Sequence, residues 1–146
     1  MALSVAASIV VPAIAQSNAN FGSVTLSNGS AQMRGYTQGG TPLSAIAREG
    51  SRGNHCVGYG ETEPDHILVL PSPVSSITLS VDSGGSDTTI LVRSAERGAV
   101  FCADDSNNAD AELQGQGWAA GSYEVWVGSF DPETRFDYQL TVQGRP

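Results

Sequence analysis

The feature that most constrains the fold is a two-residue periodicity in the second half of the sequence. Between residues 64 and 142, apolar and polar side chains alternate in short runs, at residues 66–70, 77–82, 87–93, 99–102, 123–129 and 136–143. Successive side chains of a β-strand point to opposite faces of a sheet, so this period predicts strands with one buried face and one solvated face. Turn residues separate the runs and no helical pattern lies between them. We therefore expect an all-β fold, an antiparallel β-sandwich of about seven to nine strands with little helix.

The alternation also predicts the core. In residues 136–143, Tyr138 and Leu140 share one face while Gln139 and Thr141 share the other. The same reasoning assigns eleven side chains to the interior: Ile77, Leu79, Val81, Ile90, Val92, Tyr123, Val125, Val127, Tyr138, Leu140 and Val142. Residues 93–98 are expected to close a hairpin, with Gly98 supplying a positive φ.

The first fifteen residues are interpreted as a signal peptide. The apolar run at residues 3–14 ends in Ala13-Ile14-Ala15, the small-x-small pattern that a signal peptidase cleaves after. The run is shorter than the roughly 20 apolar residues of a membrane span. We therefore expect a secreted, periplasmic or cell-surface protein. Residues 16–53 are expected to be loosely structured, with one or two strands near 23–26 and 32–37 that pack on a sandwich formed by residues 54–146.

The charge balance argues against a nucleic-acid partner. All seven basic residues are arginines, against fifteen acidic residues, and the formal net charge is −8. An acidic surface repels phosphate backbones and anionic membrane surfaces.

Cys56 and Cys102 are the two cysteines of the chain. An even pair in an exported protein favours a disulfide. The spacing does not fit a CxxC redox or metal motif, and two thiols lack enough nearby histidines for a zinc site.

A set of motifs in the second half resembles the bacterial pre-peptidase C-terminal domain family. The motifs are Pro64-Asp65-His66, Asp87-Thr88-Thr89-Ile90-Leu91-Val92, Cys102-Ala103-Asp104-Asp105-Ser106, residues 121–130 (GSYEVWVGSF) and Tyr138-Gln139-Leu140-Thr141-Val142, in order from about Cys56 to Val142. The resemblance implies a jelly-roll-like antiparallel sandwich of the kind carried by secreted proteins. Such domains are often appended to a peptidase and sometimes assist substrate binding.

No catalytic motif accompanies the strand pattern. His55 and His66 are the two histidines, and the sequence has no Gly-x-Ser-x-Gly, no His-Glu-x-x-His and no phosphate-binding glycine loop followed by lysine. A Ser/His/Asp site with distant members stays open. Asp65-His66 favours a structural histidine at a strand end over a general base. Glu61, Glu63, Asp65 and His66 fit a solvated turn better than a metal chelate. We expect no enzymatic activity.

Two tryptophans are candidate ligand contacts. Trp126 is out of phase with Tyr123, Val125 and Val127, so it should lie on the opposite face of its strand. An exposed indole there would suit a sugar or a protein partner, although cover by the N-terminal segment is favoured. Trp118 fits a loop anchor better than a binding platform.

A calcium site is a further candidate. Antiparallel pairing would place Asp87 beside Asp104 and Asp105, with Asn107 and Asp110 in the following loop. Calcium prefers such hard oxygen ligands. The alternative is that these side chains cap turns through their own backbone. Calcium is the one cofactor that the sequence suggests.

Two classes of function are favoured over an enzymatic one. The first is a secreted accessory module that binds an extracellular polysaccharide, a matrix protein or a surface ligand. The second is a structural or assembly protein of the cell envelope or extracellular space. An exposed aromatic strip beside Trp126 would favour the first, and a smooth sandwich with an open edge strand would favour the second.

Overall fold

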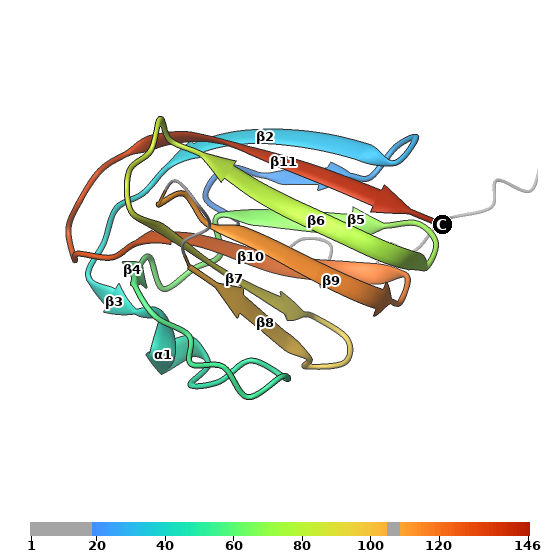
Figure 1. The fold of residues 1–146 in the computed structure, drawn as a ribbon, viewed down its shortest axis with the longest axis horizontal. Helices are drawn as coiled ribbons and strands as arrows, with labels where there is room; N and C mark the ends of the chain where they lie inside the picture. Colours follow the sequence, from blue (N-terminus) through green and yellow to red (C-terminus); the bar gives the residue numbers. More distant parts are fainter. Residues whose placement is uncertain (1–18, 105–108) are drawn as a thin grey trace, which may run out of the picture.

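The computed structural model describes residues 19–104 and 109–146, which form two packed β-sheets (Figure 1). The seven-stranded sheet contains β1 (Ser23–Thr25), β3 (Thr41–Pro42), β4 (Tyr59–Gly60), β5 (His66–Leu70), β7 (Thr88–Ser94), β8 (Val100–Ala103) and β10 (Gly121–Ser129). The four-stranded sheet has the order β2 (Ser30–Tyr36), β11 (Asp137–Arg145), β6 (Val74–Asp82) and β9 (Glu112–Trp118). A single helical turn, α1 (Leu43–Ile46), follows β3.

The pairing confirms the predicted all-β sandwich. Every strand pair is antiparallel except β1 with β5, which run parallel. The predicted hairpin joins β7 to β8, and Gly98 has φ 70°. The described residues form eleven strands, more than the seven to nine expected, because β3 and β4 are two residues long and β9 lacks a clear alternating signal.

Strand β9 was missed because its sequence, ELQGQGW, is rich in glycine and glutamine, which weaken a strand signal. The two glycines have specific roles. A Cβ atom on Gly115 would collide with the indole of Trp118. The positive φ of Gly117, 66°, falls where the alternation of β9 ends, and Trp118 turns into the core.

The main core lies between the two sheets. All eleven side chains predicted to be internal are buried there. Leu68, Leu113 and Trp118 join them, along with Met33 from β2. Residues 19–53 thus supply both sheets with strands, and β2 runs the length of β11 as its neighbour.

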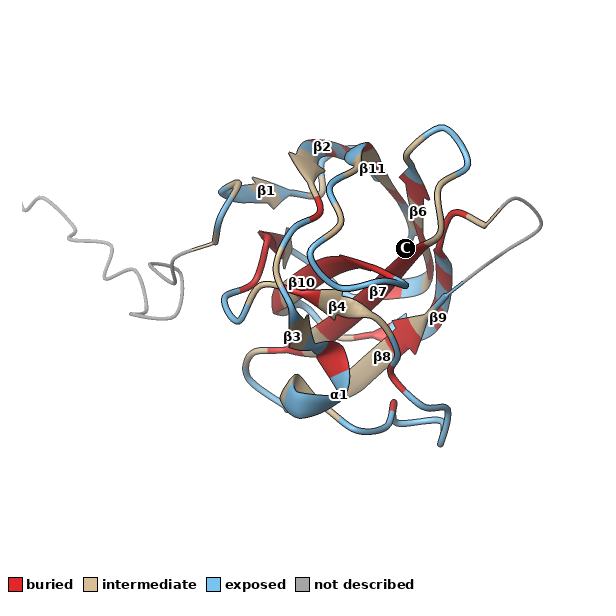
Figure 2. Cartoon of the chain, turned by 90° about the vertical axis from the view of Figure 1, so that its left-hand side faces the viewer, coloured by how far each residue is buried: buried red, intermediate tan, exposed pale blue. Residues whose placement is uncertain are grey.

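A second apolar cluster covers the other side of the seven-stranded sheet. Its buried members are Leu43, Cys56, Leu91, Cys102 and Trp126. The α1 turn and the loop of residues 47–58 lie on the side of this sheet that faces away from the four-stranded sheet (Figure 1, Figure 2). No helix within the described ranges is long and apolar enough to span a membrane.

Candidate functional site

Trp126 lies on the face of β10 that the alternation predicts, but it is not an exposed platform. Its side chain is 1 % exposed and packs against Leu43, Leu91 and the Cys56–Cys102 pair. The indole Nε1 donates a hydrogen bond to the Thr62 carbonyl at 3.2 Å. The cover comes from residues 43–62, so Trp126 anchors this segment to the sheet.

Trp118 is also buried rather than available to a ligand. Its ring stacks between Phe101 and Tyr123, with centroid distances of 4.5 and 4.9 Å. Trp118 and Tyr123 belong to the main core, and Phe101 packs against it. Neither tryptophan can stack on a sugar in this structure.

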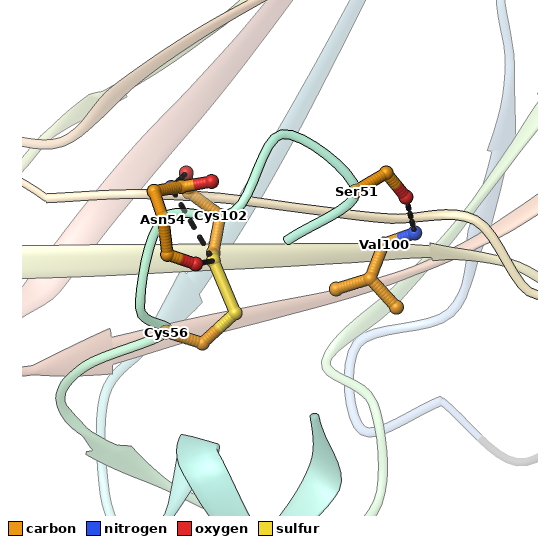
Figure 3. Close-up of a disulfide and its surroundings, with 5 residues drawn as sticks. All are labelled: Ser51, Asn54, Cys56, Val100 and Cys102. Carbon is orange, nitrogen blue, oxygen red and sulfur yellow. Dashed lines mark hydrogen bonds between the residues drawn. A yellow bond between two sulfur atoms is a disulfide. The ribbon is translucent and has the colours of Figure 1, made fainter. Parts of the chain in front are cut away.

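Cys56 and Cys102 form the predicted disulfide, with their Cα atoms 5.4 Å apart (Figure 3). The bond holds residues 50–56 along the outer edge of β8. There the Ser51 amide donates to the Val100 carbonyl at 2.6 Å, and the Asn54 amide side chain donates to the Cys102 carbonyl at 2.6 Å. An open strand edge invites pairing with other chains, so the disulfide-bound loop protects this edge.

The described residues of the predicted calcium site, Asp87, Asp104 and Asp110, lie at one end of the sandwich, where the structure gives Asp110 a clear structural role. Asp110 is buried, and its two carboxylate oxygens accept hydrogen bonds from Ser83, Gly85 and Thr88. Asp104 is exposed at the end of β8. Asp105 and Asn107 lie outside the described residues. Within the described ranges, no group of three or more His, Cys, Asp or Glu side chains could hold a metal ion. Calcium binding stays a prediction.

Asp65 is a buried carboxylate between β5 and β10. Its Oδ2 accepts the Val127 amide at 2.8 Å and its Oδ1 accepts the Asn20 side-chain amide at 3.1 Å. Burial raises the pKa of this carboxyl from 3.8 to about 6, against the lowering effect of these two hydrogen bonds. Asp65 therefore ties residue 20 to the central strand of the seven-stranded sheet.

His66, the next residue, points into the main core. It is fully buried, and its Nε2 lies 2.7 Å from the Tyr138 hydroxyl. Burial lowers the pKa of the imidazole from 6.5 to about 4. Burial, and then the nearby charge of Asp65, raises the pKa of Tyr138 above its usual value. The ring of Phe21 packs on His66 with centroids 5.6 Å apart. The pair is a neutral bridge between the sheets that a substrate does not reach.

The exposed apolar side chains gather at one place. Among the described residues, Val57 (37 % exposed) and Phe130 (56 % exposed) are the large hydrophobic side chains that face solvent, and both line one hollow of about 510 Å³. We call this the Phe130 hollow, lined by Pro42, Ser44, Cys56, Val57, Gly58, Tyr59, Phe130, Asp131 and Pro132. The sequence does not indicate this hollow, because Phe130 follows the strand predicted at residues 123–129 and the other walls come from two distant segments.

The walls of the Phe130 hollow are held by the fold. Tyr59 pairs with Ser129, and the Phe130 amide donates to the Asp87 carbonyl at 3.0 Å. Gly58, at φ 98°, leaves no room for a side chain because a Cβ atom there would collide with Thr89. The disulfide fixes Cys56 at the edge of the hollow. The apolar side chains are therefore displayed on a rigid frame.

The outward face of the four-stranded sheet has a different chemistry. Its register places uncharged amide and hydroxyl side chains next to one another across the strands. We call this set the uncharged face: Ser30, Gln32, Ser76, Thr78, Ser80, Gln114, Gln116, Gln139, Thr141 and Gln143. The charged side chains of the same face, Arg34, Asp82, Glu112, Asp137 and Arg145, lie toward the strand ends.

Comparisons with known proteins identify the fold. No protein-family model matches the sequence, and no curated protein matches it. The structure matches the pre-peptidase C-terminal domain of collagenase from Bacillus anthracis with a TM-score of 0.52 and 16 % identity, over 87 % of this chain and 96 % of that domain. The chain has a pre-peptidase C-terminal-like fold.

A second similar structure is PliG of Aeromonas hydrophila, a periplasmic inhibitor of g-type lysozyme. It has a TM-score of 0.49 and 15 % identity, over 88 % of this chain and all of that one.

In this chain, the pre-peptidase C-terminal-like fold buries its two tryptophans and displays the Phe130 hollow and the uncharged face.

Proposed function

We propose that the chain is an exported, non-catalytic binding module that attaches to an extracellular polymer, matrix protein or surface ligand. The observation that carries the proposal is the Phe130 hollow, where the two solvent-facing large hydrophobic side chains of the described residues meet. Exposed apolar side chains on a rigid frame are typical of a contact with a partner.

Export is supported by the apolar run that ends at Ala15 and by the disulfide, because disulfides persist in oxidising compartments. The absence of catalysis is supported by the state of His66. This histidine is enclosed in the core and bonded to Tyr138, so it has no path to a substrate. The similar structure named above is likewise a pre-peptidase C-terminal domain rather than a peptidase.

The test is a binding screen of the purified, disulfide-bonded chain on arrays of glycans and matrix proteins. We expect at least one ligand whose affinity falls about tenfold or more in Phe130→Ala, since buried aromatic anchors dominate binding energy. Phe130→Leu, which keeps apolar contact area, is the matched control and should bind more tightly than Phe130→Ala. Equal binding by the parent and Phe130→Ala on every ligand would refute a binding role for the hollow.

The alternative, an assembly protein of the envelope or extracellular space, is supported by the free edge of β9. Within the described residues, β9 pairs with β6 alone, and the strand contains no lysine or proline to discourage a further partner. Sedimentation measured over a range of concentrations separates the two proposals. Growth into large assemblies would favour this second role.

A further inference from the structure

The two outward faces of the sandwich differ in how far the chain covers them. The seven-stranded sheet carries the second apolar cluster and its covering segment on its outward side. The four-stranded sheet has no such cover from the described chain, and its outward side chains alternate with the buried core residues (Figure 2). The uncharged face is therefore a broad surface that is open to a partner.

The chemistry of this face is unusual for so acidic a chain. The protein has a formal charge of −8, yet one complete row across the four strands of the face is uncharged. In this row Ser30 pairs with Gln143, Gln143 with Thr78, and Thr78 with Gln114. Neighbouring strands lie about 4.8 Å apart, so these side chains form a closely spaced array of donors and acceptors.

A hollow of about 520 Å³ lies on the same face. Its lining includes Asn28, Ser30, Ser76, Thr78, Gln143 and Arg145, and it contains no carboxylate. The other hollows described on this chain each include an acidic or a large apolar side chain. This hollow therefore offers hydrogen bonds without either a negative charge or an apolar anchor.

This chemistry excludes most classes of partner. A polyanion would be repelled by the net charge, and a polycation would find no carboxylate in the row that runs from Ser30 to Gln114 or in the hollow beside it. An apolar partner would leave the amides and hydroxyls without hydrogen bonds. Sugar hydroxyls both donate and accept, as do the serine, threonine and glutamine side chains of the face.

The weakness of each single hydrogen bond favours a polymeric ligand. A neutral hydrogen bond formed in exchange for water contributes only about 0.5–1.5 kcal/mol. Useful affinity needs many such bonds at once, which a repeating chain laid across several strands provides and a single sugar does not. We propose that the uncharged face is a binding surface for a neutral polysaccharide, separate from the Phe130 hollow.

Affinity electrophoresis tests this proposal. The purified chain is run in native gels that contain mixed-linkage β-glucan, xyloglucan, galactomannan or dextran, and in parallel gels that contain alginate or hyaluronate. We expect slower migration in at least one neutral gel and none in the polyanion gels. No retardation in any neutral gel would overturn the proposal, as would retardation confined to the polyanions.

Variants locate the surface. The combined change Thr78→Val, Gln114→Ala and Gln143→Ala should weaken retardation by about tenfold or more, because three hydrogen-bonding side chains are lost. Thr25→Val with Gln38→Ala, two exposed residues outside the face, is the matched control and should match the parent. If the triple variant does not unfold cooperatively, Gln114→Glu with Gln143→Glu keeps side-chain size on exposed positions and should also weaken binding.

Variants of the Phe130 hollow and of the uncharged face show which of the two surfaces binds the polysaccharide. Phe130→Ala should leave retardation in the neutral gels unchanged. If Phe130→Ala abolishes it and the triple variant does not, the polysaccharide binds in the hollow and the inference about the uncharged face is wrong, while the proposed binding function stands.

Discussion

The Nε2 atom of His66 and the hydroxyl oxygen of Tyr138 lie 2.7 Å apart and join the two sheets of the sandwich. His66 begins β5 of the seven-stranded sheet, and Tyr138 lies on β11 of the four-stranded sheet. His66, which the sequence favours as a structural histidine over a general base, is therefore part of a link through the core.

The first prediction concerns this link. Tyr138→Phe should lower the free energy of unfolding by about 1–3 kcal/mol, because the buried Nε2 of His66 loses its partner. His66 Nδ1 already has no hydrogen-bond partner among the described residues, so no second contact compensates. Urea unfolding measures the change. Tyr36→Phe, which keeps the ring contacts of Tyr36 with Phe21 and Arg135, is the control, and an equal loss in both variants would contradict the link.

The second prediction is that Asp65 and His66 have opposite effects on stability between about pH 4 and 6. The pKa of His66 is lowered to about 4, so the unfolded chain binds more protons at this residue and stability rises with pH. The pKa of Asp65 is raised to about 6, so the folded chain binds more protons there and stability falls with pH. In the parent the two effects offset each other.

Single variants separate these effects. Relative to the parent, Asp65→Asn should become more stable as pH rises from 4 to 6, and His66→Gln should become less stable. Each difference has a limiting slope of about 1.4 kcal/mol per pH unit. Urea unfolding at constant ionic strength gives both curves. Parallel difference curves for the two variants would show that the pKa shifts do not have these opposite directions.

Much of the fold is predictable from the sequence because its strands are half-buried and obey the two-residue period. The run at residues 66–70 coincides with β5, and the others begin or end within three residues of β6, β7, β8, β10 and β11. Strand β9 could not be predicted in this way, because its residues Gly115 and Gly117 do not add to an apolar alternation.

The candidate sites are harder to predict because they depend on which segments cover which faces. The phase of Trp126 on its strand was predictable, whereas its depth depends on Leu43 and Cys56, which are distant in the chain. The Phe130 hollow joins three separate segments. Strand periodicity determines the face of a side chain but not what lies over that face.

The third prediction concerns the disulfide. Replacing both Cys56 and Cys102 by alanine should lower the free energy of unfolding by about 2–4 kcal/mol, because the unfolded chain is no longer constrained over a separation of 46 residues. Adding a reductant should shift the parent in the same direction and leave the double variant unchanged. Two free thiols in the denatured, unreduced parent would contradict the bond.

The fourth prediction tests the main core at Leu79. This residue is fully buried on β6, between Val142 of β11 and Leu113 of β9. Leu79→Ala should therefore cost about 2–5 kcal/mol, from lost burial and a cavity. Ser80→Ala, the next residue on the outward face, should change stability by less than about 0.5 kcal/mol. Equal costs for the two variants would mean that the strand does not alternate between core and solvent.

The fifth prediction separates the two roles considered for Asp110. Its carboxylate accepts the Ser83 and Gly85 amides at 3.0 Å each and the Thr88 hydroxyl at 3.1 Å, and so holds the turn between β6 and β7. Asp110→Ala leaves these donors without their acceptor, and we expect a loss of about 2–4 kcal/mol. If the carboxylate acts through these bonds, thermal unfolding should show the same loss in millimolar calcium and in chelator. A loss seen only with calcium present would instead make Asp110 a calcium ligand, since a cation that binds the folded state raises its melting temperature.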